Sequence, residues 1–271
     1  MLKRTIRLAA VTTALALAAA LSSTALADHS WNDYHIARTA NPFIIQYVDS
    51  VNSVWDGVLV EAVQRWGQSS VLEFDQVGAD DGDRTRRRCP MISGQMRVCN
   101  AAYGQNGWLG LATIGLDSQG HIDQGTAQMN DSYDWYWTPE EMNHVMCQEI
   151  GHVFGLDHTS EDGSSQGTCM DYSTDPSSQW PNAHDYDMIE QIYAHLDSYN
   201  SFTSSGGDDG GDKPCNAPPG KGCNKFGANV NVPMGLLVHS SRHHEVYVAS
   251  RPDGGYWVHH VVLAPEPGKR R

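Results

Sequence analysis

Four side chains in one short segment have the types and the spacing of a metal site with a general base: Gln148, Glu149, His152 and His158. On a helix, positions 148 and 152 lie one turn apart on the same face, so two donor atoms there can reach one ion. Glu149 lies beside them and can reach a water molecule on that ion without being a ligand. Gly155 permits the left-handed turn that would return His158 to the helix. Zinc binds such a set of three protein donors and keeps one position for water.

The same segment resembles the signature of a known family. Residues 148–158, QEIGHVFGLDH, resemble the metzincin pattern H-E-x-x-H-x-x-G-x-x-H, most closely that of the matrixin-like and small secreted bacterial members. The run Cys169-Met170-Asp171-Tyr172 resembles the Met-turn that follows this pattern. By this resemblance Met170 forms an apolar floor under the metal. Tyr172 is similar to the tyrosine that, in some metzincins, approaches zinc and stabilises the transition state.

The resemblance implies an α+β catalytic domain with a twisted mixed sheet, a zinc-bearing helix, a Met-turn and a C-terminal helix. It also implies a secreted zinc-dependent endopeptidase, in which Glu149 assists the attack of zinc-bound water on a peptide bond. The substrate would be a protein or peptide that lies extended against an edge strand, which we expect at residues 122–130. Animal matrixins are held latent by a propeptide cysteine. No suitable cysteine precedes the first expected strand, so we expect no latency of that kind.

One residue departs from the pattern, because Gln148 stands at the first histidine position. Its side-chain oxygen reaches about as far as an imidazole nitrogen but is a weaker donor for zinc. Three interpretations stay open. Gln148 binds the metal; or His152 and His158 bind it with another donor such as Tyr172 or water; or metal and activity are lost. The last alternative describes a catalytically impaired binding protein on a metzincin fold.

The positioning elements follow from hydrophobic periodicity and end signals. We expect strands at residues 43–48, 71–77, 108–116 and 120–130, and helices at 54–66, 139–154 and 185–196. The helix that carries the motif has the clearest start. Thr138 precedes Pro139, and Glu141 follows three residues after Thr138, which predicts a capping box with proline at the first helical position.

The ends of the chain have their own signals. Residues 1–27 combine three basic residues, an Ala/Leu-rich run and Ala25-Leu26-Ala27, as a cleaved secretory signal does, so we expect an extracellular protein without a stable membrane anchor. We assign residues 28–203 to the metalloprotease domain and the Gly/Asp/Ser-rich stretch 204–213 to a linker. Residues 214–271 alternate apolar and polar side chains and predict a small β-rich module of unknown role. Its histidines, at 239, 243, 244, 259 and 260, are expected at surface strand positions, with adventitious metal binding as the alternative.

Export makes disulfides the best interpretation of the 6 cysteines. Closeness in sequence favours the pairs Cys89–Cys99, Cys147–Cys169 and Cys215–Cys223, although six cysteines allow about fifteen pairings. The rival interpretation is a Cys/His metal site, which no C-x-x-C pair supports.

Composition excludes some partners. The 271 residues have 18 Lys+Arg against 32 Asp+Glu, and a net charge of −14 argues against nucleic-acid binding. With 40% apolar residues the chain can build a real core, so global disorder is not expected. We expect a monomer that binds Zn2+. Ca2+ is a further candidate, with ligands among Asp117, Asp123, Asp131 and Asp134, because secreted proteases often use oxygen-ligated calcium to stiffen loops. Most other histidines, including His35, His121, His184 and His195, occur singly without ligand spacing.

Overall fold

A computed structural model describes residues 29–31, 33–202 and 232–265. The expected signal segment, the linker and the Cys215–Cys223 pair lie outside these residues. Among the helices of the described part, none has the length and apolar character needed to cross a membrane.

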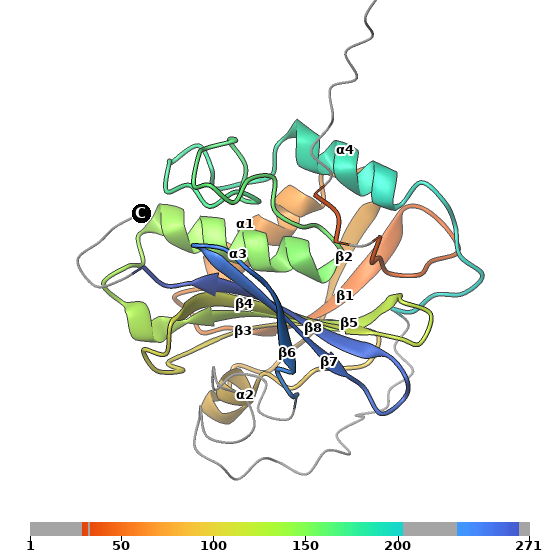
Figure 1. Cartoon of the computed structure of the whole chain (residues 1–271), viewed down its shortest axis with the longest axis horizontal. Helices are drawn as coiled ribbons and strands as arrows, with labels where there is room; N and C mark the ends of the chain where they lie inside the picture. Colours follow the sequence, from red (N-terminus) through yellow and green to blue (C-terminus); the bar gives the residue numbers. More distant parts are fainter. Residues whose placement is uncertain (1–28, 32, 203–231, 266–271) are drawn as a thin grey trace, which may run out of the picture.

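One mixed sheet of eight strands forms the centre of the molecule, in the order β2-β1-β3-β5-β4-β8-β7-β6 (Figure 1). The strands β1, β2, β3 and β5 run parallel, and β4 lies antiparallel to β5. The last three strands continue the antiparallel part. Their bounds are β1 Phe43–Ser50, β2 Leu72–Ala79, β3 Met96–Ala101, β4 Trp108–Leu116, β5 Ile122–Asn130, β6 Leu236–Ser240, β7 His244–Ser250 and β8 Tyr256–Leu263.

The helices lie mostly on one face of this sheet. Figure 1 shows α1 (Asp56–Trp66), α3 (Pro139–Val153) and α4 (Ala183–Ile192) on the same side, with α2 (Asp83–Arg88) on the other. A short 3₁₀ turn, Asp131–Tyr133, joins β5 to the approach of α3. The α+β class expected from the sequence is therefore confirmed. Neither α2 nor β3 was expected, because residues 83–101 carry too few apolar side chains in a regular period.

The core is packed where α1 and α3 meet the sheet. Trp66 is fully buried, stacks edge-on against Phe154 at 5.0 Å and donates its indole N–H to the Cys147 carbonyl. Val153 packs against β5 at Gly125, where an added Cβ would lie only 2.5 Å from its Cγ1. The close approach holds the C-terminal half of α3 directly over β4 and β5.

The start of α3 follows the expected capping in part. Thr138 accepts a hydrogen bond from the backbone N–H of Glu141 at 3.3 Å, and Pro139 occupies the first turn. The Glu141 carboxylate instead accepts a hydrogen bond from the Tyr136 hydroxyl, at 2.5 Å. The threonine half of the predicted box is thus present, whereas the glutamate is used by a neighbouring side chain.

We expect Thr138→Ala to lower the free energy of unfolding by about 1 kcal/mol, because it removes the acceptor for one helix-terminal N–H. Urea denaturation followed by circular dichroism measures the change. Thr138→Ser is the matched control, since it keeps the acceptor oxygen and should unfold close to the wild type. Equal stability of the alanine and serine variants would contradict a capping role.

The C-terminal strands extend the main sheet. The segment is β-rich, as expected, but its strand β8 pairs antiparallel with β4 along nearly the whole length of that strand. A row of unpaired backbone groups on β4 would otherwise be exposed at the sheet edge. Buried Val258, Val261 and Val262 on β8 add apolar contacts to this pairing. The β4 edge is therefore covered by the chain's own C-terminal segment.

The prediction that the substrate lies against residues 122–130 as an edge strand is wrong, and the cause is again the order of the strands in the sheet. Strand β5, at the predicted residues, lies between β3 and β4 and is paired on both sides. Its alternating side chains fit an edge strand equally well, since periodicity does not reveal how many neighbours a strand has. The edge next to α3 belongs to β4, and β8 occupies it.

Candidate metal centre

The last turns of α3 carry the motif residues, and every residue from His144 to Val153 is buried. This burial results from the packing of the helix over β4 and β5. After the helix, Gly155 adopts a φ of +101°, and an added Cβ would lie 2.1 Å from the Tyr34 carbonyl oxygen. The left-handed turn predicted at this glycine is therefore confirmed.

The turn brings His152 and His158 together, as their spacing predicted. Their ring centroids lie 4.5 Å apart at an interplanar angle of 74°. The Nδ1 atom of His152 lies 2.8 Å from the Leu156 carbonyl oxygen, which leaves its Nε2 atom as the potential ligand atom. That Nε2 atom is buried and has no hydrogen-bond partner.

The Met-turn lies directly under α3. An added Cβ on Gly151 would come within 2.7 Å of the Met170 sulfur, so only glycine lets the methionine approach the helix this closely. A disulfide between Cys147 and Cys169 joins the helix to the turn, and a second joins Cys89 to Cys99, as predicted for both pairs. The Tyr172 hydroxyl lies 2.6 Å from Nε2 of His158. The tyrosine therefore contacts an expected metal ligand.

Gln148 is fully buried, and the nitrogen and the oxygen of its amide have different surroundings. The Nε2 group donates to the Asp171 carbonyl at 2.8 Å, next to Nε2 of His144 at the same carbonyl. The Oε1 atom, which would be the metal donor, is buried without a hydrogen-bond partner. The amide is thus held by the Met-turn, and its oxygen stays available.

Glu149 lies between α3 and β4. The carboxylate is fully buried, and burial raises its pKa well above the usual value, while the backbone amide of Ala112 opposes the rise. Space for it exists because Gly110 has no side chain: an added Cβ there would lie 2.1 Å from Oε1 of Glu149. The position of this carboxylate depends on a glycine of the neighbouring strand.

We expect Gly110→Ala to lower the free energy of unfolding by about 1–3 kcal/mol, because the new methyl group would overlap Glu149 and Val145. Gly57→Ala is a matched control, since its added Cβ meets nothing within 4 Å and lies in α1, where it should stabilise by about 0.4–1 kcal/mol. Urea denaturation of both variants measures the difference. Similar midpoints for the two would show that β4 and Glu149 are not in close contact.

Two further histidines reach this site from the C-terminal segment. His244 begins β7 and His260 lies in β8, and both are buried, so the predicted surface positions are wrong for them. The ring of His260 stacks on His152 at 4.3 Å, and that of His244 lies 4.3 Å from His158. His243 and His259 are buried as well. One signal could have indicated this: His260 shares a strand face with Val258 and Val262, which is the apolar face.

All four rings at this site are held in the neutral form. Burial lowers the pKa of His152 to about 3, and the nearby His244 ring lowers it further, despite the opposing effect of the hydrogen bond that the ring donates to the Leu156 carbonyl. Burial and neighbouring imidazoles also lower the pKa values of His158, His244 and His260. Neutral imidazole is the form that binds metals.

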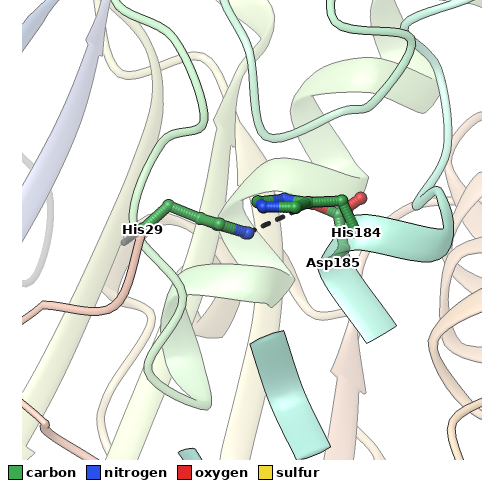
Figure 2. Close-up of side chains that lie close together, drawn as sticks. All are labelled: His29, His184 and Asp185. Atoms are coloured by element: carbon green, nitrogen blue, oxygen red, sulfur yellow. Dashed lines mark ion pairs between the residues drawn. The ribbon is translucent and has the colours of Figure 1, made fainter. Parts of the chain in front are cut away.

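Other histidines expected to be isolated are also grouped by the fold. Figure 2 shows His29, from the N-terminal segment, facing His184 and Asp185 at the start of α4. The His29 and His184 rings stack at 4.7 Å, and Nε2 of His29 lies 3.8 Å from the Asp185 carboxylate. A second group joins His35, His121 and Asp197. These groups tie distant segments together.

The aspartates considered for calcium have protein partners. Asp123 pairs with Arg251 at 2.7 Å, and Asp131 accepts the Trp55 indole N–H at 3.0 Å. Asp117 accepts backbone N–H groups of Gln119 and His121. These contacts give no support to a calcium site.

A family model described as Matrixin matches residues 43–194, a range that includes α3, the Met-turn and α4. No curated protein matches the chain.

Proposed function

The chain belongs to the matrixin family, a family of zinc-dependent metalloproteases, and from this premise we propose that it is a secreted zinc-dependent endopeptidase. The observation that carries the proposal is the buried set of Glu149, His152 and His158 above Met170. Secretion is supported by the signal-like residues 1–27 and by two disulfides, which oxidising compartments favour.

The residues present fit a zinc ion. His152 and His158 offer neutral imidazoles, and the Gln148 oxygen and the Tyr172 hydroxyl are the nearby oxygen donors that the sequence indicates. When bound, zinc polarises the scissile carbonyl and makes a water molecule acidic near neutral pH.

The chain's own groups carry the proton transfers. Glu149 takes a proton from the water whose oxygen attacks the carbonyl carbon, and it delivers that proton to the leaving nitrogen as the C–N bond breaks. The Tyr172 hydroxyl donates a hydrogen bond to the oxygen on which negative charge develops. Met170 would form the apolar floor of the site, as the family resemblance implies.

The substrate would add as a strand to the sheet edge nearest the site, using backbone hydrogen bonds. That edge is β4, because α3 packs over β4 and the carboxylate of Glu149 lies against Gly110. Strand β8 now makes those hydrogen bonds. Cleavage therefore requires a form of the protein in which β8 has left β4.

Two observations that count against peptidase activity favour a second function, that of a binding protein. The Gln148 amide is bound to the Asp171 carbonyl, and β8 covers the edge that a substrate needs. On this alternative the protein is a secreted binding protein without peptidase activity. Its recognition surface would lie outside the β4 edge that β8 covers.

The deciding experiment places a site for a specific protease within residues 204–213 of the full chain, so that the C-terminal segment can be released after folding. Size-exclusion chromatography verifies the release. With one equivalent of zinc, the released protein should cleave casein or an extended peptide, and a chelator should stop the cleavage. Absence of cleavage in the released, zinc-loaded protein would reject the endopeptidase in favour of the binding protein.

A further inference from the structure

We propose that zinc in this protein is bound by His152 and His158 together with His244 and His260, so that the C-terminal strands supply half of the ligands. The inference rests on the proposed function only for the identity of the metal. It assigns the missing ligand of the motif to a segment far along the chain, beyond the residues that the family model matches.

The four rings lie together in one buried cluster. Neighbouring centroids lie 4.3 Å apart for His152 and His260, 4.5 Å for His152 and His158, 4.3 Å for His158 and His244, and 5.6 Å for His244 and His260. The two diagonal pairs are each 6.4 Å apart. Imidazoles bound to one tetrahedral zinc through nitrogens about 2.1 Å from it have centroids about 5 Å apart. The planes of His152, His244 and His260 lie within 16° of parallel, so these rings must rotate before the lone pairs of all four meet at one ion.

The outer nitrogens of three rings lie near oxygens that would fix their orientation. Nδ1 of His152 lies 2.8 Å from the Leu156 carbonyl oxygen, and Nδ1 of His158 lies 3.1 Å from the Asp157 carboxylate. Nδ1 of His244 lies 3.7 Å from the Glu161 carboxylate. Such outer partners of zinc-binding histidines set the tautomer and direct Nε2 to the metal.

Several ring nitrogens have no hydrogen-bond partner in the described structure, whereas Nε2 of His158 lies 2.6 Å from the Tyr172 hydroxyl. Nε2 of His152, both ring nitrogens of His244 and Nδ1 of His260 are buried without a hydrogen-bond partner. Leaving a buried polar group without a partner is destabilising. A shared ligand that accepts their lone pairs explains several such groups in one cluster. A divalent cation is that ligand, because the four neutral rings offer lone pairs and no charge.

Pairing of β8 with β4 places His260 at the site. His260 lies opposite Ala112 in the β4–β8 register, and His244 lies opposite Val262 in the β7–β8 register. Both histidines are therefore fixed by the sheet to which α3 is packed. A site with four protein ligands leaves no position for water, which is the arrangement of a structural zinc site. The metal-bound protein with β8 in place is thus a latent form.

If these four histidines bind the zinc, Gln148 has a role other than that of a metal ligand. A ring from the C-terminal segment replaces the first histidine of the motif while the segment is docked, so Gln148 is not needed as a ligand in the latent form. Its amide instead stabilises the Asp171 carbonyl of the Met-turn. Release of the segment would leave His152 and His158, with the Gln148 oxygen free to bind in the opened site.

The first test counts ligands in the wild-type full chain, so it does not depend on a variant that folds. The protein is loaded with one equivalent of zinc, and X-ray absorption at the zinc edge measures the number of imidazoles. We expect four imidazole ligands. Two imidazoles with oxygen ligands would overturn the inference.

The second test measures zinc affinity by competition with a coloured chelator. His244→Ala and His260→Ala should each bind zinc at least about tenfold more weakly than the wild type. His195→Ala is the control, because His195 is over half exposed and lies beside His35 and Asp197 instead. Circular dichroism of each metal-free variant shows whether it folds. Unchanged affinity in folded His244→Ala and His260→Ala would overturn the inference.

These measurements are separate from the test of peptidase activity. Tail variants that lose zinc affinity, in a protein that never cleaves peptides, would support the four-histidine site and reject the endopeptidase. Cleavage by the released protein, with zinc affinity unchanged in the tail variants, would support the endopeptidase and reject the four-histidine site.

Discussion

Glu149→Gln should lower kcat/KM for a peptide substrate by about 10²–10⁴-fold in the released, zinc-loaded protein, because an amide cannot accept the proton of the attacking water. The substitution keeps the shape of the side chain and its contact with Gly110. Initial rates on a fluorogenic peptide at substrate concentrations below KM measure the change directly.

The free energy of unfolding of Glu149→Gln should equal or exceed that of the wild type. The wild-type carboxyl group is fully buried and has a raised pKa, so its charged form is disfavoured by the fold. A neutral amide of the same size avoids that cost, and a loss of activity could not then be attributed to unfolding. Glu140→Gln is the matched control, since Glu140 lies exposed in the first turn of the same helix. Wild-type cleavage rates in Glu149→Gln would exclude Glu149 as the base.

Asp197→Ala should lower the free energy of unfolding by about 3–5 kcal/mol, because it leaves a buried guanidinium without its countercharge. Arg38 is 1% exposed, and its Nη1 atom lies 3.0 Å from the Asp197 carboxylate. The same carboxylate accepts the Arg38 backbone N–H at 3.1 Å. The ion pair joins the segment before β1 to the chain that follows α4. Urea denaturation at neutral pH measures the loss.

The penalty should shrink at acid pH. Burial raises the pKa of Asp197, but the hydrogen bonds from the Arg38 amide and His35, with the nearby imidazoles, outweigh it and lower the pKa below its usual value. A lowered folded-state pKa gives stability that is present above the unfolded value of about 3.9 and is lost as the pH falls through the folded value. Wild type and Asp197→Ala should therefore converge in stability below about pH 4.

Asp187→Ala is the control for this prediction, because Asp187 is exposed on α4 and its removal should change stability by no more than about 0.5 kcal/mol. An Asp197→Ala penalty as small as that of the control would mean that Arg38 finds sufficient compensation in backbone carbonyls. A penalty that stays constant down to acid pH would contradict the lowered pKa.

The sequence by itself determined the local parts of the site. Thr138 and Pro139 fixed the start of α3, because capping needs only residues within one turn. Gly155 fixed the reversal that returns His158, since a φ of +101° is readily available only to glycine. The Cys147–Cys169 bridge could be predicted because it closes a loop of only 22 residues. Each of these features depends on atoms that are close in sequence.

The tertiary structure alone decided which strand borders the site and which histidines enter it. Strand periodicity shows which side chains share a face, but it does not show which strand lies alongside, so β5 resembled an edge and β8 resembled part of a separate module. Histidine occurs both in cores and on surfaces, so alternation could not reveal that His260 faces His152. Those two residues meet because β8 pairs with β4 beneath α3, and backbone hydrogen bonding between strands carries almost no sequence signature.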